Sequence, residues 1–269
     1  MIDLKYPILF VHGMGFRDRR LIGYWGRIPG ALEREGCKVY FGNQDSNGTI
    51  ESNGEFLAGQ IRSILSESGA QKLNVIAHSK GGLDMRYAIS ALNMGRYIAS
   101  LTTIGTPHNG SKTMDRVMRF PKWIIRSIAA CSDLWLRILG DKQPNAYRVF
   151  ESFTTQHAKA FNEENPDVHD VYYQSFAFVL SRPFSDILLW FPHFVVSCIE
   201  GENDGLVTPT AAAWGDFRGV YRGCTNRGIS HADEVDLRRR PFTKKSGPGV
   251  SDITDFYIVL VRELQKKGF

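Results

Sequence analysis

Three residues of this 269-residue chain could together perform nucleophilic acyl transfer: Ser79, Asp204 and His231. A serine hydroxyl is a weak nucleophile at neutral pH, so it needs a base within hydrogen-bond reach. The base in turn needs an acceptor that fixes its tautomer and stabilises its charged form. We assign Ser79 as the nucleophile, His231 as the general base and then acid, and Asp204 as the orienting carboxylate. Their order along the chain, serine then acid then histidine, is one of the orders known for such triads.

The residues around Ser79 predict a strained turn between a strand and a helix. Asn74–Ala77 is a short apolar run typical of a buried parallel strand, and Leu83–Leu92 has helical spacing. A serine in such a turn needs small residues two positions before and two positions after it, and these are Ala77 and Gly81. Ala77 stands where glycine is commoner. The pattern indicates the nucleophile elbow of an α/β-hydrolase.

A second loop could stabilise the negative charge that develops during acyl transfer. Tyr6–Val11 is an apolar run that predicts a buried strand and is followed by His12-Gly13-Met14-Gly15. Chemistry collects at the carboxyl ends of strands in such sheets, and a glycine-containing loop there can aim a backbone N–H at an oxyanion. We therefore predict an oxyanion hole formed by the backbone N–H groups of Met14 and Lys80.

Other titratable residues compete for the catalytic roles. Asp186 is the rival for the acid, and Glu202 is a more distant one. His231 is preferred among seven histidines because it alone lies in a loop after the last expected strand. His12 and His78 lie in strand-end loops, where we expect them to support the backbone.

The elements that must position these residues predict an α/β fold with a mostly parallel sheet and helices on both faces, because strands alternate with helices. Besides those above, strands are expected at Cys37–Phe41, Leu101–Ile104, Val171–Val179, Val195–Glu200 and Val220–Tyr221, and helices at Trp25–Glu35, Ser52–Ser66 and Asp252–Lys266. The chain is expected to form one domain over residues 1–269.

The alternation stops between about residues 112 and 170, which predicts an inserted cap. There Ile124, Ile128, Cys131, Trp135 and Ile138 recur at spacings of four and three, as in an amphipathic helix. This helix could pack on the core or act as a lid over an apolar site. A second aromatic loop, at about residues 182–194, could line the same site.

Composition and charge narrow the function classes. The chain is 43% hydrophobic and 23% charged with a net charge of +5, as in an ordinary globular protein. No nucleic-acid-binding module or basic stripe accompanies the charge. The four cysteines form no CxxC pair, which argues against a structural zinc site. No transmembrane segment or signal peptide is recognised, so the protein is expected either to be cytoplasmic or to be secreted, with the chain beginning at its mature end.

Five motifs in family order resemble the true bacterial lipases of the Pseudomonas and Burkholderia kind and their Bacillus and Staphylococcus relatives. They are Tyr6–Met14, Ala77–Gly82, Thr106–Ser111, Asn203–Val207 and His231–Val235. The resemblance spans most of the chain and is loose only between Lys112 and Asp170. It implies a lipase or carboxylesterase whose lid opens at a lipid interface.

The resemblance also implies a structural calcium near the catalytic histidine, with Asp233 at one ligand position and the Pro241 carbonyl at another. The family's further side-chain ligand falls at Leu237, which cannot coordinate, and the expected upstream aspartate falls near Arg182, with only Asp186 close by. A hard cation wants several oxygens, so the ligand set is incomplete. The chemistry itself needs no cofactor. The Bacillus relatives carry an additional zinc site, but the chain has no histidine between residues 42 and 74, ahead of the elbow.

We therefore predict a serine ester hydrolase that cleaves acylglycerols or other apolar esters through an acyl-enzyme on Ser79. A peptidase or amidase, and an acyltransferase, would use the same triad. A non-catalytic binding protein would be marked by loss of a triad residue, and all three residues are present.

Overall fold

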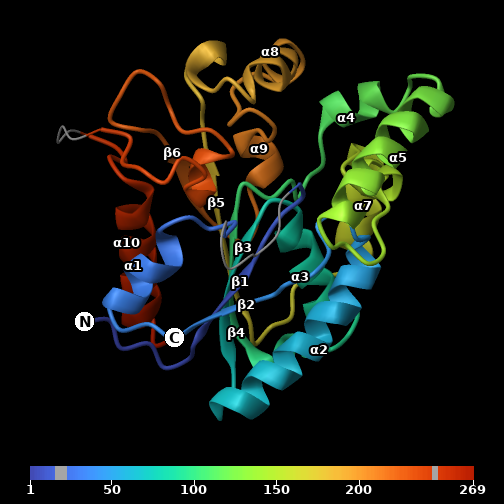
Figure 1. The fold of residues 1–269 in the computed structure, drawn as a ribbon. Coiled ribbons are helices and arrows are strands. Elements are labelled where there is room, and N and C mark those ends of the chain that lie inside the picture. The colour runs from blue at the N-terminus through green and yellow to red at the C-terminus, as the bar shows by residue number, and fades with distance from the viewer. Residues whose placement is uncertain (16–22, 244–247) are drawn as a thin grey trace.

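The central element is a sheet of six parallel strands in the order β2-β1-β3-β4-β5-β6 (Figure 1). The computed structural model describes residues 1–15, 23–243 and 248–269. The strands are β1 Ile8–Val11, β2 Val39–Phe41, β3 Leu73–His78, β4 Ile98–Ile104, β5 Tyr172–Phe178 and β6 Asp216–Tyr221. Because all strands run in one direction, the loops at their carboxyl ends meet at one edge of the sheet.

Helices cover both faces of the sheet, as the sequence predicted. Helices α1 Ile28–Arg34 and α10 Ile253–Lys266 lie on one face, and α2 Ile50–Ser68 and α3 Lys80–Ser90 lie on the other (Figure 1). Alternate strand side chains point to opposite faces, so the core is divided in two. Phe10 and Ile76 belong to the cluster on the α1 and α10 side, whereas Leu9 and Val75 belong to the cluster on the α2 and α3 side.

The segment between β4 and β5 contains helices only. They follow the 3-10 helix η1 (Met94–Tyr97) and β4, and are α4 Lys112–Val117, α5 Lys122–Ile138, α6 Ala146–Ser152 and α7 Thr155–Glu164. They stand beside the carboxyl edge of the sheet, at the upper right of Figure 1. No helix among the described residues is long and apolar enough to cross a membrane.

Helix α5 carries apolar side chains on its solvent-exposed face as well as on its buried face. Ile125, Ala129 and Leu136 are buried, whereas Trp123 is 71% exposed and Trp135 60% exposed. Helix α5 is therefore amphipathic as predicted, yet the core covers only part of its apolar surface.

The prediction of a strand at Val195–Glu200 is wrong. The segment between β5 and β6 holds η2 Pro183–Ser185, α8 Trp190–Ile199 and α9 Pro209–Ala212, and η3 Asp233–Val235 follows β6. The β-branched residues near Val195 favour a strand locally. They form the second half of α8 instead, which buries Val196 and His193 in the fold. Tertiary packing has overridden local propensity here.

Candidate active site

Ser79 lies at the turn between β3 and α3 with φ 54° and ψ −131°. This is a left-handed conformation for a residue with a side chain, and such strain costs about 1–3 kcal/mol. The surroundings explain the small neighbours. A Cβ on Gly81 would lie 2.4 Å from the His12 carbonyl oxygen, and a Cβ on Gly13 would lie 2.7 Å from the Ser79 Cβ. The glycines thus let β1, its loop and the elbow approach closely.

His231 and Asp204 are brought together by the structure. His231 Nδ1 lies 2.8 Å from Asp204 Oδ2, and the His231 backbone N–H donates to the Asp204 carbonyl at 2.8 Å. The other carboxylate oxygen, Oδ1, accepts from the backbone N–H groups of Leu206 and Val207, each at 2.8 Å. Burial raises the pKa of Asp204, but the charge and hydrogen bond of His231 outweigh it and lower the pKa. The carboxylate is therefore ionised and fixed in orientation.

The two rival acids lie elsewhere. Asp186 accepts a hydrogen bond from the Ser230 hydroxyl at 2.6 Å, and Glu202 pairs with Arg222 at the surface. No contact between either carboxylate and His231 is found among the described residues. Of the three carboxylates considered, the geometry places only Asp204 against the imidazole.

Met14 and Lys80, the residues predicted for the oxyanion hole, both lie next to Ser79 in the structure, one across the cavity and one along the chain. Met14 lines the same cavity as Ser79, and Lys80 is the first residue of α3. Neither backbone N–H has a hydrogen-bond acceptor among the residues that the structure describes. The Lys80 side chain points away from the chemistry, because its Nζ pairs with the buried Asp84 at 2.7 Å. Among the described residues, neither amide is thus occupied by an acceptor.

Glu234 is a buried carboxyl group that the sequence reasoning missed. Its Oε2 lies 3.1 Å from His78 Nε2 and 3.8 Å from His231 Nδ1. Burial and the neighbouring Asp204 raise the pKa of Glu234 well above its usual value, which favours the neutral form of the carboxyl group. Its position three residues after His231 could have indicated this contact, because residues three apart on a helical turn lie on the same face.

His78 completes this network without taking part in the assigned chemistry. Its Nδ1 lies 2.6 Å from the Tyr24 hydroxyl and its Nε2 lies 3.1 Å from Glu234 Oε2, so both ring nitrogens are engaged in hydrogen bonds. Burial, and then the charge of His231, lower the pKa of His78 well below its usual value. His78, His231 and Glu234 are close enough for three metal ligands. However, the atoms that would bind a metal are already engaged: His78 Nε2 is hydrogen-bonded to Glu234, and His231 Nδ1 to Asp204.

Ser79 and His231 open into a shared apolar cavity of about 480 Å³. Its wall comes from α4, α5, α6 and the loop after Asp204, through Met114, Val117, Ile125, Ile128, Phe150, Phe153, Leu206 and Val207. A smaller cavity of about 180 Å³ shares Met14, Leu206 and His231 with it. The imidazole therefore lines both cavities.

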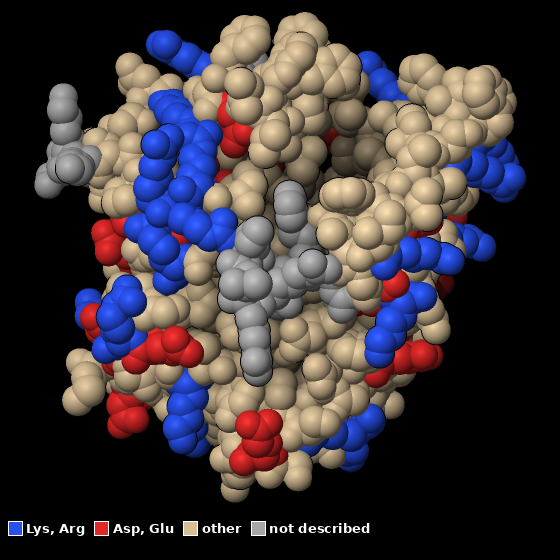
Figure 2. All heavy atoms as spheres, viewed as in Figure 1, with Lys and Arg blue, Asp and Glu red and all other residues tan. Residues whose placement is uncertain are grey.

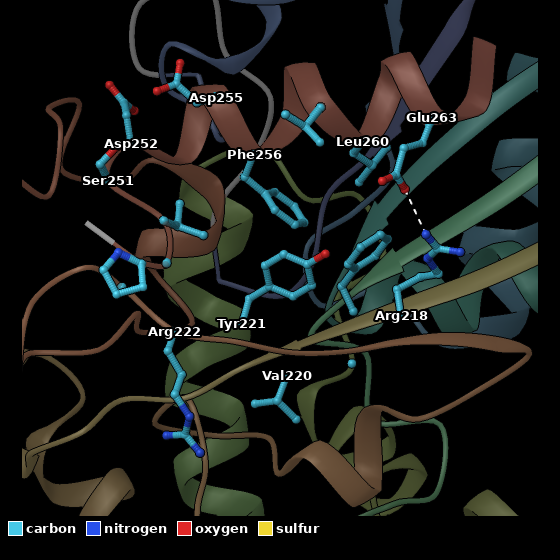
Figure 3. A pocket seen from close by; sticks show the side chains of 17 residues that line it. Arg218, Val220, Tyr221, Arg222, Ser251, Asp252, Asp255, Phe256, Leu260 and Glu263 are labelled. Carbon is cyan, nitrogen blue, oxygen red and sulfur yellow. Dashed lines mark hydrogen bonds and ion pairs between the residues drawn. The ribbon is translucent and has the colours of Figure 1, made fainter. Parts of the chain in front are cut away.

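A larger cavity of about 890 Å³ lies between β6 and α10, away from these residues (Figure 3). Charged side chains gather there, and Arg218 pairs with Glu263 at 3.0 Å. It is lined by neither Ser79 nor any histidine. Its chemistry offers no counterpart to the triad, so we place the site in the 480 Å³ cavity.

The residues expected to bind calcium do not fit a metal ion. Asp233 Oδ2 lies 3.1 Å from Arg227 Nη2, and Asp233 Oδ1 lies 3.0 Å from Arg238 Nε. Leu237 lines the smaller cavity beside His231 and offers no oxygen from its side chain. A calcium ion needs six to eight oxygen ligands. Two guanidinium groups already neutralise the carboxylate that would have to supply one.

Comparison with known proteins identifies the family. The family model described as palmitoyl protein thioesterase matches residues 7–180. A Saccharomyces cerevisiae protein named triacylglycerol lipase 2 is 31% identical over 263 residues, covering 92% of this chain and 75% of that protein. The chain belongs to the α/β-hydrolase family of lipases and palmitoyl protein thioesterases.

A second relative and one solved structure give further likenesses, the latter in fold. A Pseudomonas fragi triacylglycerol lipase is 26% identical and is matched over 99% of this chain and 98% of its own length. The crystal structure of Staphylococcus hyicus lipase has the same fold, with a TM-score of 0.69 at 16% identity over 98% of this chain and 97% of that chain. The predicted α/β-hydrolase fold and lipase resemblance are confirmed. The protein is a carboxylic ester hydrolase, and the amidase, acyltransferase and non-catalytic alternatives are not favoured.

Proposed function

We propose that the protein cleaves apolar carboxylic esters such as acylglycerols through an acyl-enzyme on Ser79. The observation that carries the proposal is the opening of Ser79 and the paired His231 into one apolar cavity. His231 Nε2 takes the proton from the Ser79 hydroxyl as its oxygen attacks the ester carbonyl. The N–H groups of Met14 and Lys80 would donate to the oxyanion of the tetrahedral intermediate.

Breakdown of this intermediate follows from the same groups. The protonated His231 gives its proton to the departing alkoxide, so the alcohol leaves and Ser79 carries the acyl group. Water then attacks the acyl-enzyme with His231 as base, which releases the carboxylic acid and restores the serine hydroxyl. Asp204 stabilises the imidazolium in both halves because it is buried, ionised and 2.8 Å from Nδ1.

The cavity supports an apolar acyl chain as the substrate group. Its cap-side wall carries Ile125, Ile128, Phe150 and Phe153, and no Asp, Glu, Lys or Arg of the described residues lines it. A charged acyl group would lose its hydration there without gaining a partner. The smaller cavity, which His231 also lines, would take the alcohol group.

A series of p-nitrophenyl esters from acetate to palmitate tests the proposal, with a palmitoyl thioester as a further substrate. The wild type should hydrolyse the longer esters with the higher kcat/KM, and Ser79→Ala should lose activity by several orders of magnitude. Lys72→Ala, at the sheet's opposite edge, is the matched control and should keep full activity. Ester hydrolysis that survives in Ser79→Ala would refute the assigned nucleophile.

We also propose that α5 and α8 contact lipid surfaces. Large apolar side chains of this region lie exposed: Phe120, Trp123, Leu134, Trp135, Ile138, Phe184, Ile187, Leu188, Trp190, Phe191 and Phe194. Figure 2 shows mostly uncharged side chains at this end of the molecule, with lysines and arginines at its margins. Exposed aromatic residues with flanking basic residues are typical of helices that lie in a membrane interface.

Vesicle binding tests this contact. Trp123→Ser/Trp135→Ser should weaken sedimentation with phosphatidylcholine vesicles that contain phosphatidylglycerol, and Val259→Ser on α10 should not. Activity on soluble butyrate esters should stay unchanged in both variants, since neither tryptophan lines the cavity. Equal vesicle binding by all three proteins would overturn the proposed lipid contact.

A further inference from the structure

Two arginines hold a pair of buried carboxylates beside the loop that carries His231. The Asp233 side chain is 0% exposed and lies between Arg227 and Arg238, at 3.1 and 3.0 Å. The Asp186 side chain is 5% exposed, and Arg238 and Arg227 approach it at 3.5 and 4.0 Å. Each guanidinium therefore faces both carboxylates.

The same arginines also bind the backbone of the loop after β5. Arg227 Nε donates to the Ser185 carbonyl at 2.7 Å, and Arg238 Nη2 donates to that carbonyl at 3.0 Å. Two carboxylates and a carbonyl oxygen are the ligand types that a hard divalent cation takes. Here two guanidinium groups lie against those oxygens, with Asp233 Oδ1 in an ion-pair contact with Arg238 but in no hydrogen bond among the described residues, and a divalent cation among them would face two positive charges.

The arginine cluster reaches the catalytic histidine through Ser230, the residue before it. The Ser230 hydroxyl donates to Asp186 Oδ2 at 2.6 Å and accepts from the Asp233 N–H at 3.2 Å. The Ser230 N–H donates to Asp233 Oδ2 at 3.2 Å. Both carboxylates therefore fix the backbone that carries His231. A shift of that backbone would change the distance between the imidazole and Ser79.

We propose that Arg227 and Arg238 are positioning residues that do here what a bound cation would do, so the fold and the histidine loop need no calcium. They neutralise Asp186 and Asp233 and join the loop after β5 to the turn that carries His231. The effect on catalysis rests on the proposed function, whereas the effect on stability does not. Thermal unfolding therefore separates failure of this inference from failure of the assigned triad.

The first experiment measures the Tm of the wild type with EDTA, with CaCl2 and with MgCl2. We expect the same Tm in all three, because no carboxylate of the cluster lacks a cationic partner. A Tm that falls in EDTA and returns with calcium would overturn the inference, whatever the enzyme's activity.

The second experiment is a double-mutant cycle between Arg238 and Asp233. Arg238→Ala should lower Tm on the order of 5 °C or more, because it leaves a buried carboxylate short of a partner. Adding Asp233→Asn removes the uncompensated charge, so the double variant should be more stable than additivity of the two single changes predicts. Strict additivity would overturn the inference. Arg222→Ala, which breaks an exposed ion pair with Glu202, is the matched control and should leave Tm unchanged.

A kinetic measurement tests the positioning role. Arg238→Ala should lower kcat for p-nitrophenyl butyrate about tenfold or more with little change in KM, since the arginine touches neither cavity. Arg238→Lys should restore part of the loss, because it keeps the charge but not the two-nitrogen contact. A folded Arg238→Ala enzyme with wild-type kcat would overturn the positioning role.

Discussion

Replacing Asp204 with asparagine should abolish most of the activity while leaving the fold intact. Asp204 Oδ1 accepts from two backbone N–H groups, those of Leu206 and Val207. An asparagine must keep its carbonyl oxygen at that position, because an NH2 group cannot accept from those donors. Its NH2 group then faces His231 Nδ1, where the carboxylate oxygen now lies at 2.8 Å. The asparagine would donate to Nδ1 and force the imidazole proton onto Nε2.

The magnitude follows from the tautomer. An imidazole that carries its proton on Nε2 cannot accept the proton of Ser79, so kcat should fall by about 10³–10⁴, which corresponds to roughly 4–5.5 kcal/mol of barrier. KM should change little, because Asp204 lines neither cavity. The shape and the two backbone hydrogen bonds are kept, so the loss in Tm should be small.

Steady-state hydrolysis of p-nitrophenyl butyrate between pH 6 and pH 9 checks this prediction. Asp186→Asn is the comparison, because that carboxylate contacts Ser230 and the arginines but not His231. Its kcat should fall far less than that of Asp204→Asn. The reasoning is refuted if Asp204→Asn keeps activity within tenfold of the wild type, or if Asp186→Asn is the more damaging change.

Three further predictions concern the loop geometry, the cavity and the buried acid. Gly13→Ala should lower both Tm and kcat, at a cost of about 1–3 kcal/mol, because its Cβ would meet the nucleophile's Cβ at 2.7 Å; Gly59→Ala, where a Cβ meets nothing within 4 Å, should raise Tm slightly. Ile128→Trp should shift the preferred p-nitrophenyl ester to a shorter chain by filling the cavity wall, whereas Ile138→Trp outside the cavity should not. Burial and a nearby aspartate raise the pKa of Glu234 in the folded protein. The neutral group therefore destabilises the fold least below the unfolded-state pKa of about 4.3. As pH rises from there toward the folded-state pKa, the unfolded chain ionises first and stability is lost. The free energy of unfolding of Glu234→Gln, measured with urea, should therefore equal that of the wild type in acid. Above about pH 5 it should exceed the wild-type value by up to about 1.4 kcal/mol for each pH unit.

Much of the sheet could be predicted from sequence because its strands are continuous apolar runs. Leu73–His78 is buried on both faces, so neither face needs polar side chains and the run is easily recognised. The elbow is recognisable because its tight, strained turn admits only small residues around Ser79, which leaves a distinctive sequence pattern. The strand predicted at Val195–Glu200 was wrong because β-branched residues occur in both strands and buried helices, and only packing decides between them.

The interactions around the histidine depended on contacts that no local pattern encodes. Asp233 was expected as a metal ligand, but Arg227 and Arg238 meet it from either side only once the fold is formed. Glu234 lies three residues after His231 in the sequence, but its raised pKa follows from its complete burial and from the neighbouring Asp204. Sequence spacing brings a side chain to the right loop, whereas its charge state is set by what packs over it.

The most direct test of the proposed acyl-enzyme is the reaction of the folded protein with a serine-directed alkyl fluorophosphonate, followed by intact-mass and peptide analysis. We predict one phosphonyl group per chain, placed on Ser79, with loss of ester hydrolysis in proportion to labelling. Ser79→Ala should take up no label, and His231→Ala should label slowly because the hydroxyl has lost its base. Labelling at another residue, or unchanged hydrolysis after complete labelling of Ser79, would contradict the proposed mechanism.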